Sequence, residues 1–317
     1  MDLIESITFQ PPLWSIEQER IIKLPYEHLA SNPGKNIRNK LIHVFNKFYK
    51  LDEDKVNKIS QLLEILHISS LLIDDIEDDS PYRRGRPSAH VLYGTPMTIN
   101  AANYMYFVSM LHLQQLSENE ESATLTKLLV IFNEEMVNLH RGQGLDIYWR
   151  DNFVIPNEQD YFQMVMNKTG GLFRLAVRIM ECLQSNYDKT LVPFSNLLGV
   201  LYQVRDDYMN LKDPQMIQSK GFASDITEGK FSYPLIHALH YAKAQDPEGF
   251  EFLTSTLKMR SPDDDVKNKV VDYLENVSLS IQHTKKWLEE FTDSIKEKYM
   301  PGDDKELFNI IESLGSL

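Results

Sequence analysis

Apolar residues recur three and four positions apart along most of this chain, which is the spacing of one face of an α-helix. The pattern is clear in residues 59–66, 197–201 and 270–274, whereas the alternation of apolar and polar residues that is typical of strands is nearly absent. Short segments that contain proline or glycine interrupt the pattern and are typical of connections between helices. No long linker or repeat divides the chain. The pattern therefore predicts an all-α fold in which residues 1–317 form a single large helical domain.

The two ends of the chain depart from this pattern. Pro11 and Pro12 set off a short N-terminal segment, so we expect residues 1–20 to form an arm that packs on its own body or on a second subunit. Residues 248–317 are of mixed polarity and acidic, which indicates that they close the bundle and carry no chemistry.

Composition and charge narrow the functional classes. The chain has 317 residues, 42% of them hydrophobic, and a formal net charge of −13, so it can bury a sizeable core but has no general basic surface for nucleic acid. Cys182 is the only cysteine, which excludes an intrachain disulfide and a thiolate metal cluster and fits a reducing compartment. No apolar run approaches the ~18 residues that a membrane span requires, and residues 1–20 lack the features of a cleaved secretory signal. We therefore expect a soluble, cytoplasmic protein without a membrane span.

The sharpest feature is an acidic run at the end of an apolar helical segment, in residues 71–79. Asp74 and Asp78 are four positions apart and Asp75 and Asp78 are three apart, so their carboxylates share one face of a helix, where they repel one another. A single run of this kind is most often the solvated end of a helix.

A second acidic motif has the same spacing. Asp206 and Asp207 follow the apolar residues 197–201, and Asn210 stands where the last carboxylate of the first motif would be. Because this motif continues an apolar helix, a solvated tail is a poorer explanation for it. Magnesium prefers six oxygen ligands and is commonly held by one or two carboxylates together with substrate phosphate. Two facing helices that each supply a half-site of this kind therefore predict a site for magnesium and a diphosphate.

Basic residues lie at separate places where a polyanion could bind. Lys35 and Arg38 are one turn apart at the start of a helix, where backbone N–H groups already favour an anion. Arg83 and Arg84 follow the first acidic motif, and their guanidinium groups suit phosphate oxygens, although they could also neutralise the aspartates. His67 lies on the helical stripe of the first acidic motif, which favours a role in the site over plain packing.

Consecutive glycines at positions 170–171 fall inside a helical pattern, where they weaken or kink the helix and free backbone carbonyl groups to face a cavity. Lys168 and Thr169 precede them, and an ammonium group and a hydroxyl at such a kink suit a diphosphate and an electron-poor carbon, respectively. The alternative is a plain turn between helices. Lys220 and Lys230 add two further cations after the second acidic motif.

Together these motifs resemble those of the trans-isoprenyl diphosphate synthases, most closely the geranylgeranyl diphosphate synthases of fungi and animals. The similarity covers roughly residues 25–240 and rests on the segments GKNIR, LHISSLLIDDIEDDSPYRRG, NAANYMYF, LHRGQGLDIYWRD, NKTGGLF, YQVRDDYMNLKD and DITEGKFSYPLIHAL. A DDxxD motif alone would be weak evidence, but this combination is highly specific. The resemblance implies an all-α, single-domain fold around a deep central cavity, with the two aspartate motifs facing each other across its mouth.

The resemblance also implies a role for each candidate residue. The magnesium ligands, with about three ions around the bound diphosphate, would be Asp74, Asp75, Asp78, Asp206 and Asp207. The isopentenyl diphosphate site would comprise Lys35, Arg38, His67 and Arg84. The allylic diphosphate would be contacted by Arg83, Lys168, Lys220 and Lys230. Thr169 and Gln203 would lie near the reacting carbons, and with Lys168 and Lys230 they form the predicted catalytic set. The ligand role of Asn210 stays open, because it departs from the acidic pattern.

Product length depends on the residues that face the growing tail. One helical turn advances ~5.4 Å, close to one extended isoprene unit, so residues one turn before the first acidic motif act as a ruler. Ser69 and Ser70 are small there and let a longer tail pass, whereas the resemblance implies that large aromatic residues stop growth in farnesyl-forming animal enzymes. Tyr106, Phe107 and His140 match the deeper floor of the family's cavity and favour a stop at twenty carbons.

The resemblance therefore implies a prenyltransferase, a geranylgeranyl diphosphate synthase that joins isopentenyl diphosphate to farnesyl diphosphate, with geranyl and dimethylallyl diphosphates as further allylic partners. Metal ions and cations draw charge onto the leaving diphosphate, the allylic C–O bond ionises, the isopentenyl double bond attacks, and loss of a proton completes the condensation. The alternatives are a farnesyl or longer-chain synthase, a non-catalytic subunit of such a synthase, and a class I terpene cyclase, which needs no second diphosphate site. The resemblance and the N-terminal arm also favour a homodimer or an assembly of dimers.

Overall fold

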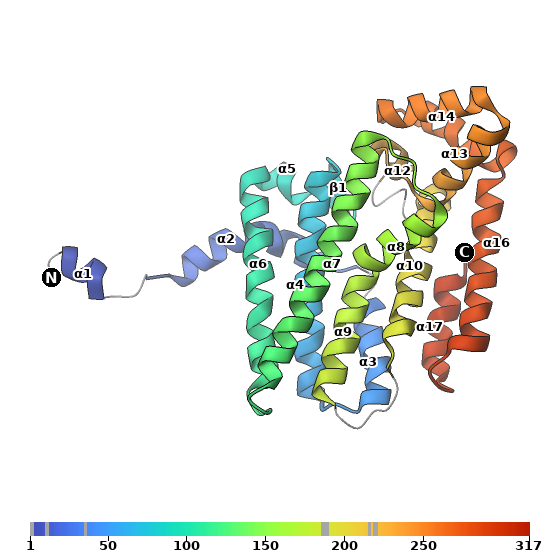
Figure 1. Cartoon of the computed structure of the whole chain (residues 1–317). Helices are drawn as coiled ribbons and strands as arrows, with labels where there is room; N and C mark the ends of the chain where they lie inside the picture. Colours follow the sequence, from blue (N-terminus) through green and yellow to red (C-terminus); the bar gives the residue numbers. More distant parts are fainter. Residues whose placement is uncertain (1–2, 10–12, 35–36, 185–189, 215–216, 218–220) are drawn as a thin grey trace.

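The computed structural model describes residues 3–9, 13–34, 37–184, 190–214, 217 and 221–317. It shows a body of long helices that run roughly side by side (Figure 1). The helices of the N-terminal part are α1 (Leu3–Phe9), α2 (Ile16–Ala30), α3 (Ile37–Tyr49), α4 (Glu53–Glu77), α5 (Ala89–Tyr93), α6 (Thr95–Ser117) and α7 (Thr124–Asn152). The helices of the C-terminal part are α8 (Glu158–Lys168), α9 (Gly170–Leu183), α10 (Val192–Lys212), α12 (Ser224–Glu228), α13 (Tyr233–Gln245), α14 (Pro247–Met259), α15 (Asp264–Asp272), α16 (Ser280–Ser294) and α17 (Lys305–Gly315).

Strands are nearly absent from the described part of the chain. Its one sheet is a hairpin of two-residue strands, β1 (Tyr82–Arg83) and β2 (Arg86–Pro87), which pair antiparallel shortly after α4. The two residues between the strands, Arg84 and Gly85, both have positive φ angles, as a tight hairpin turn requires. The prediction of an all-α fold is confirmed.

The long helix α4 shows how the apolar pattern produces this body. The Asp52 side chain accepts a hydrogen bond from the backbone N–H of Lys55 and so caps the start of the helix. The apolar stripe that follows faces inward, and Ile59, Leu62 and Leu66 are fully buried. They belong to one large core cluster that α4 shares with α7, α9 and α10. The first acidic motif lies at the end of α4, where this apolar stripe stops.

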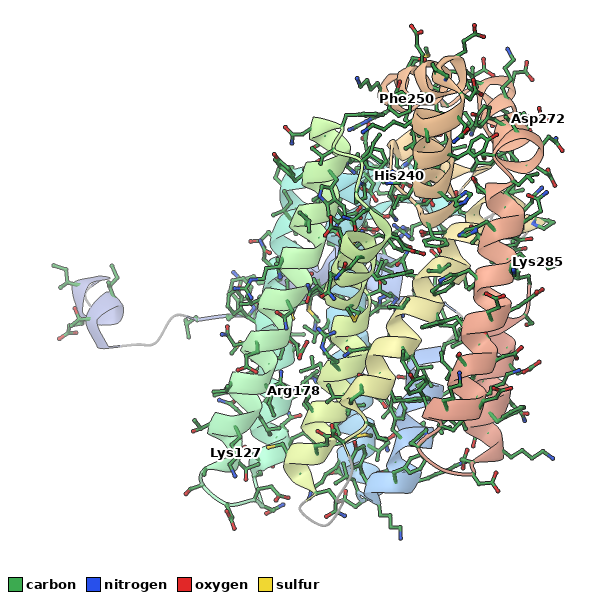
Figure 2. The ribbon with its side chains drawn as sticks, turned by 45° about the vertical axis from the view of Figure 1, so that its right-hand side comes forward. Lys127, Arg178, His240, Phe250, Asp272 and Lys285 are labelled. Carbon is green, nitrogen blue, oxygen red and sulfur yellow. The ribbon has the colours of Figure 1, made fainter. Side chains whose placement is uncertain are left out.

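The helices α8 and α9 are separated by a one-residue interruption at Thr169, next to the consecutive glycines that predicted a kink. Beyond the interruption, α9 is anchored to α7 by charged side chains. Arg174 donates two hydrogen bonds to the buried carboxylate of Glu135, and Arg178 donates to Glu135 and Glu134. Figure 2 shows Arg178 in the lower half of the body, between these two helices.

The C-terminal helices cover α8 and α10. Helices α13, α16 and α17 pack against α10, and two π-helical segments, η1 (Tyr273–Val277) and η2 (Ile295–Tyr299), continue α15 and α16. Leu253, Leu288 and Leu307 are fully buried and belong to the same core cluster as α4. Lys285 marks the outer face of this part of the molecule (Figure 2). None of the helices that the structure describes is long and apolar enough to cross a membrane.

The predicted N-terminal arm, residues 1–20, contains helix α1 and the start of helix α2. Helix α1 lies apart from the helical body in Figure 1, and its two described isoleucines are exposed. Helix α2, however, begins at Ile16 and packs against α6, where Glu19 accepts a hydrogen bond from the Tyr104 hydroxyl at 2.7 Å. A capping box at Ser15 starts α2 at this point, and Glu19 attaches the end of the arm to α6 while Ile16 is exposed. A contact of the arm with a second subunit stays a prediction.

Candidate active site

A cavity of about 390 Å³ opens between the helices that carry the predicted motifs. Its walls come from α3 and the residues before it, α4, the β1–β2 hairpin, α6, α7, α8, α9, α10 and the segment after α12. The fold therefore brings together motifs that are far apart in the sequence. Of the residues predicted for the site, those that line the cavity are Arg38, His67, Ser70, Asp74, Arg83, Arg84, Tyr106, His140, Lys168, Thr169, Gln203, Asp206 and Lys230.

The three aspartates of the first motif have different surroundings. Asp74 lines the cavity, and its carboxylate lies 3.1 Å from Arg83. Asp75 is buried and paired with Arg83, while Asp78 is paired with Arg150 of α7 at 2.5 Å. Arg83 therefore neutralises Asp74 and Asp75, as the second of the two predicted roles requires, and it also lines the cavity. Asp74 is the aspartate of this motif that lines the cavity.

The two aspartates of the second motif also differ. Asp206 lines the cavity, whereas Asp207 is only 1% exposed. The Asp207 carboxylate accepts hydrogen bonds from the Tyr161 hydroxyl at 2.6 Å, the Tyr233 backbone N–H at 2.7 Å and the Gln203 amide at 2.8 Å. Burial raises the pKa of Asp207, and these hydrogen bonds oppose that shift only in part. Asp207 thus ties α10 to α8 and α13, while Asp206 faces the cavity.

Asn210, whose ligand role the sequence left open, connects α10 to α12. Its amide donates to the Ser224 hydroxyl at 2.8 Å, and its carbonyl oxygen accepts from the backbone N–H of Asp225 at 3.2 Å. Helix α12 leads to Lys230 on the cavity wall. Burial lowers the pKa of Lys230, but the carboxylates of Asp225 and Asp146 outweigh burial and raise it well above its ordinary value. Asn210 therefore stabilises the segment that carries this cation.

The interruption between α8 and α9 places two polar groups at the cavity. The Lys168 ammonium donates to Asp146 of α7 at 2.7 Å and lies 3.7 Å from Asp74. Burial lowers the pKa of Lys168, but the carboxylates of Asp146, Asp74 and Asp78 together outweigh burial, so the pKa is raised. The Thr169 hydroxyl donates to the side-chain oxygen of Gln203 at 2.6 Å, and Gln203 in turn binds the second acidic motif. The interruption thus joins both acidic motifs.

A polar row on α7, which the sequence reasoning missed, supports the first motif. Gln143 donates to Glu77 at 2.7 Å and to Asp74 at 3.3 Å, and Asp146 and Arg150 follow it at intervals of three and four. These intervals place all three side chains on one face of α7. The signal was present in the segment LHRGQGLDIYWRD, whose polar residues at helical spacing were used only as part of the resemblance.

A second group of cations lines the same cavity. Arg38 is partly buried, and its guanidinium carbon lies 5.9 Å from the centre of the Tyr202 ring. Arg84 donates to the backbone carbonyl of Asn32 at 2.6 Å, which anchors it beside the start of α3. Burial, reinforced by the neighbouring arginines, lowers the pKa of His67 well below its ordinary value, so the imidazole is neutral at neutral pH. The group offers two permanent charges and one neutral hydrogen-bonding ring to an anion.

Two further cations were predicted from the sequence. Lys35 and Lys220 lie outside the described residues, so their place in the site stays a prediction. Glu64, which the sequence reasoning did not single out, lines the cavity near Arg38 and Arg84. Burial lowers the pKa of both arginines, and the Glu64 carboxylate opposes that shift.

The residues predicted to face the growing tail divide into two sets. Ser70, Tyr106 and His140 line the cavity, and the rings of Tyr106 and His140 are 5.9 Å apart. Neither Ser69, which is fully buried, nor Phe107, which is 71% exposed on α6, lines this cavity, and their role in product length stays a prediction. Neighbouring residues on a helix point about 100° apart, so one member of each pair faces the cavity and the other does not.

The acidic side chains at the cavity have the chemistry that magnesium requires. Asp74, Glu77 and Asp206 present carboxylate oxygens to the cavity. Burial and the nearby Asp74 carboxylate raise the pKa of Asp78. A bound cation would relieve the repulsion between these two carboxylates. Among the residues that the structure describes, no three His, Cys, Asp or Glu side chains are grouped closely enough to hold a metal ion by themselves. A divalent ion would therefore also need oxygens from water or a bound diphosphate.

Comparison with known proteins agrees with this site. Residues 19–274 match the profile of the polyprenyl synthetase family. A geranylgeranyl pyrophosphate synthase of Eremothecium gossypii is 58% identical to this chain, and the alignment covers 100% of both. The geranylgeranyl pyrophosphate synthase spyE of Aspergillus fumigatus is 45% identical over 89% of this chain and 75% of its own length. Geranylgeranyl pyrophosphate synthase 1 of Zymoseptoria tritici is 44% identical over 88% of this chain and 80% of its own length. The matched residues include both acidic motifs and the interruption between α8 and α9, and the chain belongs to the polyprenyl synthetase family.

Proposed function

We propose that this chain is a prenyltransferase that condenses isopentenyl diphosphate with farnesyl diphosphate to form geranylgeranyl diphosphate. The observation that carries the proposal is the presence of two cation groups in one cavity with both acidic motifs. One group is Lys168 with Lys230, and the other is Arg38 with Arg84. Two such groups suit two diphosphates, whereas a terpene cyclase needs a site for only one. The names of the relatives described above support the same product.

Each wall of the cavity then has a task. Arg38, Arg84 and the neutral His67 would bind isopentenyl diphosphate by charge and hydrogen bonding. Asp74 and Asp206 would hold magnesium, which when bound neutralises the allylic diphosphate and makes it a better leaving group. The number of ions, about three, stays a prediction.

Ionisation of the allylic C–O bond depends on the groups beside the leaving diphosphate. Lys168 and Lys230 would stabilise the negative charge that develops there. Thr169 and Gln203, which are hydrogen bonded to each other, would direct oxygen atoms toward the positive charge that develops on the allylic carbon. The second substrate's double bond then attacks this carbon, and the departed diphosphate is a suitable base for the final proton.

The proposal is tested with purified protein, farnesyl diphosphate, isopentenyl diphosphate and magnesium, with the products separated by chromatography. We expect a twenty-carbon diphosphate whose formation stops when a chelator removes magnesium. A product of mainly fifteen or thirty carbons would instead favour the farnesyl or longer-chain alternative. Diphosphate release without isopentenyl diphosphate would indicate a cyclase, and a lack of turnover would favour a non-catalytic subunit.

Tyr106→Ala is expected to shift the product from twenty carbons to longer chains. Tyr106 and His140 line the cavity side by side, so we propose that their rings form the floor that stops the tail. Removing one ring opens space for about one more five-carbon unit. Tyr299→Ala is the control, because this exposed tyrosine of η2 lies neither at the cavity nor on α6 or α7. Product chromatography of both variants measures the effect, and unchanged products from Tyr106→Ala would contradict a floor at this position.

We also propose that the chain forms a homodimer through the outer faces of α6 and α7. Exposed apolar side chains follow one face of each helix, with Phe107 and Leu111 one turn apart on α6 and Val130 and Val137 two turns apart on α7. A second copy could bury this surface in an isologous contact. Sedimentation equilibrium is expected to give the mass of two chains, and Val130→Glu is expected to shift it toward one chain. A single-chain mass for the unaltered protein would contradict the proposal.

The cytoplasmic location stays a prediction from the sequence.

A further inference from the structure

The segment that carries Lys168 and Thr169 is held between two helices at unusually short range. Helix α7 approaches it at Gly142, and helix α10 approaches it at Gly199. Both glycines lie in the interior of long helices, where glycine is less favourable than alanine by about 1 kcal/mol. Helix propensity therefore gives no reason for glycine at these positions, but close approach does.

On the α7 side, a methyl group at Gly142 would overlap the backbone nitrogen of Lys168 and lie 2.9 Å from its Cα. Both are backbone atoms, so the clash could not be relieved by turning a side chain. Gly144 lies two positions further along the same helix, and a methyl group there would meet nothing within 4 Å. The requirement for glycine thus belongs to Gly142, at the point where α7 touches Lys168.

On the α10 side, a methyl group at Gly199 would lie 2.6 Å from the Cα of Gly170 and 3.1 Å from its nitrogen. Gly170 is the first residue of α9 and directly follows Thr169. The two glycines meet backbone to backbone, so this contact also leaves no side chain that could move aside.

Each of the two helices also binds a side chain of the same segment one turn further on. Asp146, four residues after Gly142, accepts a hydrogen bond from the Lys168 ammonium at 2.7 Å. Gln203, four residues after Gly199, accepts a hydrogen bond from the Thr169 hydroxyl at 2.6 Å. In each helix, therefore, a glycine contacts the backbone of the segment, and a polar side chain one turn later binds the ammonium of Lys168 or the hydroxyl of Thr169.

We propose that Gly142 and Gly199 are positioning residues for prenyl transfer: they set the depth at which Lys168 and Thr169 enter the cavity. The proposal rests on the function proposed above. A methyl group at either glycine would push the segment away from its helix and stretch the hydrogen bond one turn further on. A displacement of about 1 Å at a reacting group can lower kcat by about a hundredfold.

The test compares Gly142→Ala and Gly199→Ala with the matched control Gly144→Ala. We expect kcat to fall by about tenfold to a hundredfold in the first two variants, with the KM for isopentenyl diphosphate changed less than about twofold, because its proposed site lies at other residues. Gly144→Ala is expected to keep the kcat of the unaltered protein. Because the proposal has Gly142 act through Lys168 and Thr169, adding Gly142→Ala to a protein that carries Lys168→Ala and Thr169→Ala should change kcat by less than about twofold. A merely structural role would instead lower kcat in that background as well, and such a result would overturn the proposal.

A second readout does not depend on turnover. Calorimetric titration with inorganic pyrophosphate and magnesium is expected to show about tenfold weaker binding to Gly142→Ala than to Gly144→Ala. Equal affinities would overturn this inference even if the unaltered protein makes the twenty-carbon product, whereas a lack of that product would overturn the proposed function alone. If neither Gly142→Ala nor Gly199→Ala folds while Gly144→Ala does, the glycines are structural only and the inference fails.

Discussion

Asp74→Asn is expected to keep the fold and to lower kcat with farnesyl and isopentenyl diphosphates by about a thousandfold or more. Asp74 is the aspartate of the first motif that lines the cavity, and its carboxylate lies between Arg83 at 3.1 Å and Lys168 at 3.7 Å. Asparagine keeps the shape of the side chain but removes the charge that would hold magnesium against a diphosphate. Steady-state kinetics over a range of magnesium concentrations measures the loss, and the residual activity should require more magnesium.

Asp79→Asn is the control for this experiment. Asp79 ends the same acidic run, is exposed, and has a φ of 52°, a conformation that asparagine also tolerates. The substitution removes the same charge about one helical turn away from the cavity position, so kcat should stay within about twofold of the unaltered value. Near-normal turnover by Asp74→Asn, or an equal loss in both variants, would mean that the acidic run acts only through its total charge.

The architecture could be predicted from the sequence because local signals agreed with one another. The buried stripe of α4, the Asp52 cap that starts it and the glycines beside the interruption at Thr169 are each encoded within a few residues. How the N-terminal arm meets the rest of the chain could not be predicted, because it depends on the contact of Glu19 with Tyr104 of α6. That contact joins residues 85 positions apart, and no local pattern displays it.

The candidate site could be predicted as a set of residues but not as a geometry. Asp74 and Asp75 are neighbours of identical chemistry, yet one lines the cavity and the other is buried against Arg83. The rotation of α4 about its axis decides between them, and this rotation depends on how α4 packs against its neighbours. Gln143 was missed for a related reason, since its partner Glu77 is 66 positions away in the sequence. The roles of Asp75 and Gln143 therefore become clear only when their partners in the folded chain, Arg83 and Glu77, are known.

Asp206→Asn and Asp207→Asn are expected to separate catalysis from stability at two adjacent aspartates. Asp206 lines the cavity, so asparagine there should lower kcat by about a hundredfold to a thousandfold while the free energy of unfolding changes by less than about 0.5 kcal/mol. Asp207 is buried and accepts three hydrogen bonds on its two oxygens. Asparagine supplies only one oxygen, so at least one buried donor loses its acceptor, at a cost of about 1–3 kcal/mol. Urea unfolding and steady-state kinetics on the same preparations measure both effects.

Tyr161→Phe provides the matched control for the stability change, because it removes one donor to Asp207 and leaves the carboxylate in place. We expect Tyr161→Phe alone to lower the free energy of unfolding by about 1 kcal/mol. In a double variant of Tyr161→Phe with Asp207→Ala the two losses should not add, because Asp207→Ala removes both oxygens and hence the same hydrogen bond from the Tyr161 hydroxyl, and the shortfall should be about 1 kcal/mol. Fully additive losses would mean that the Tyr161 hydroxyl and Asp207 stabilise the fold independently. A large loss of stability in Asp206→Asn would contradict the division of roles, because a side chain that faces the cavity should leave α10 in place when only its charge is removed.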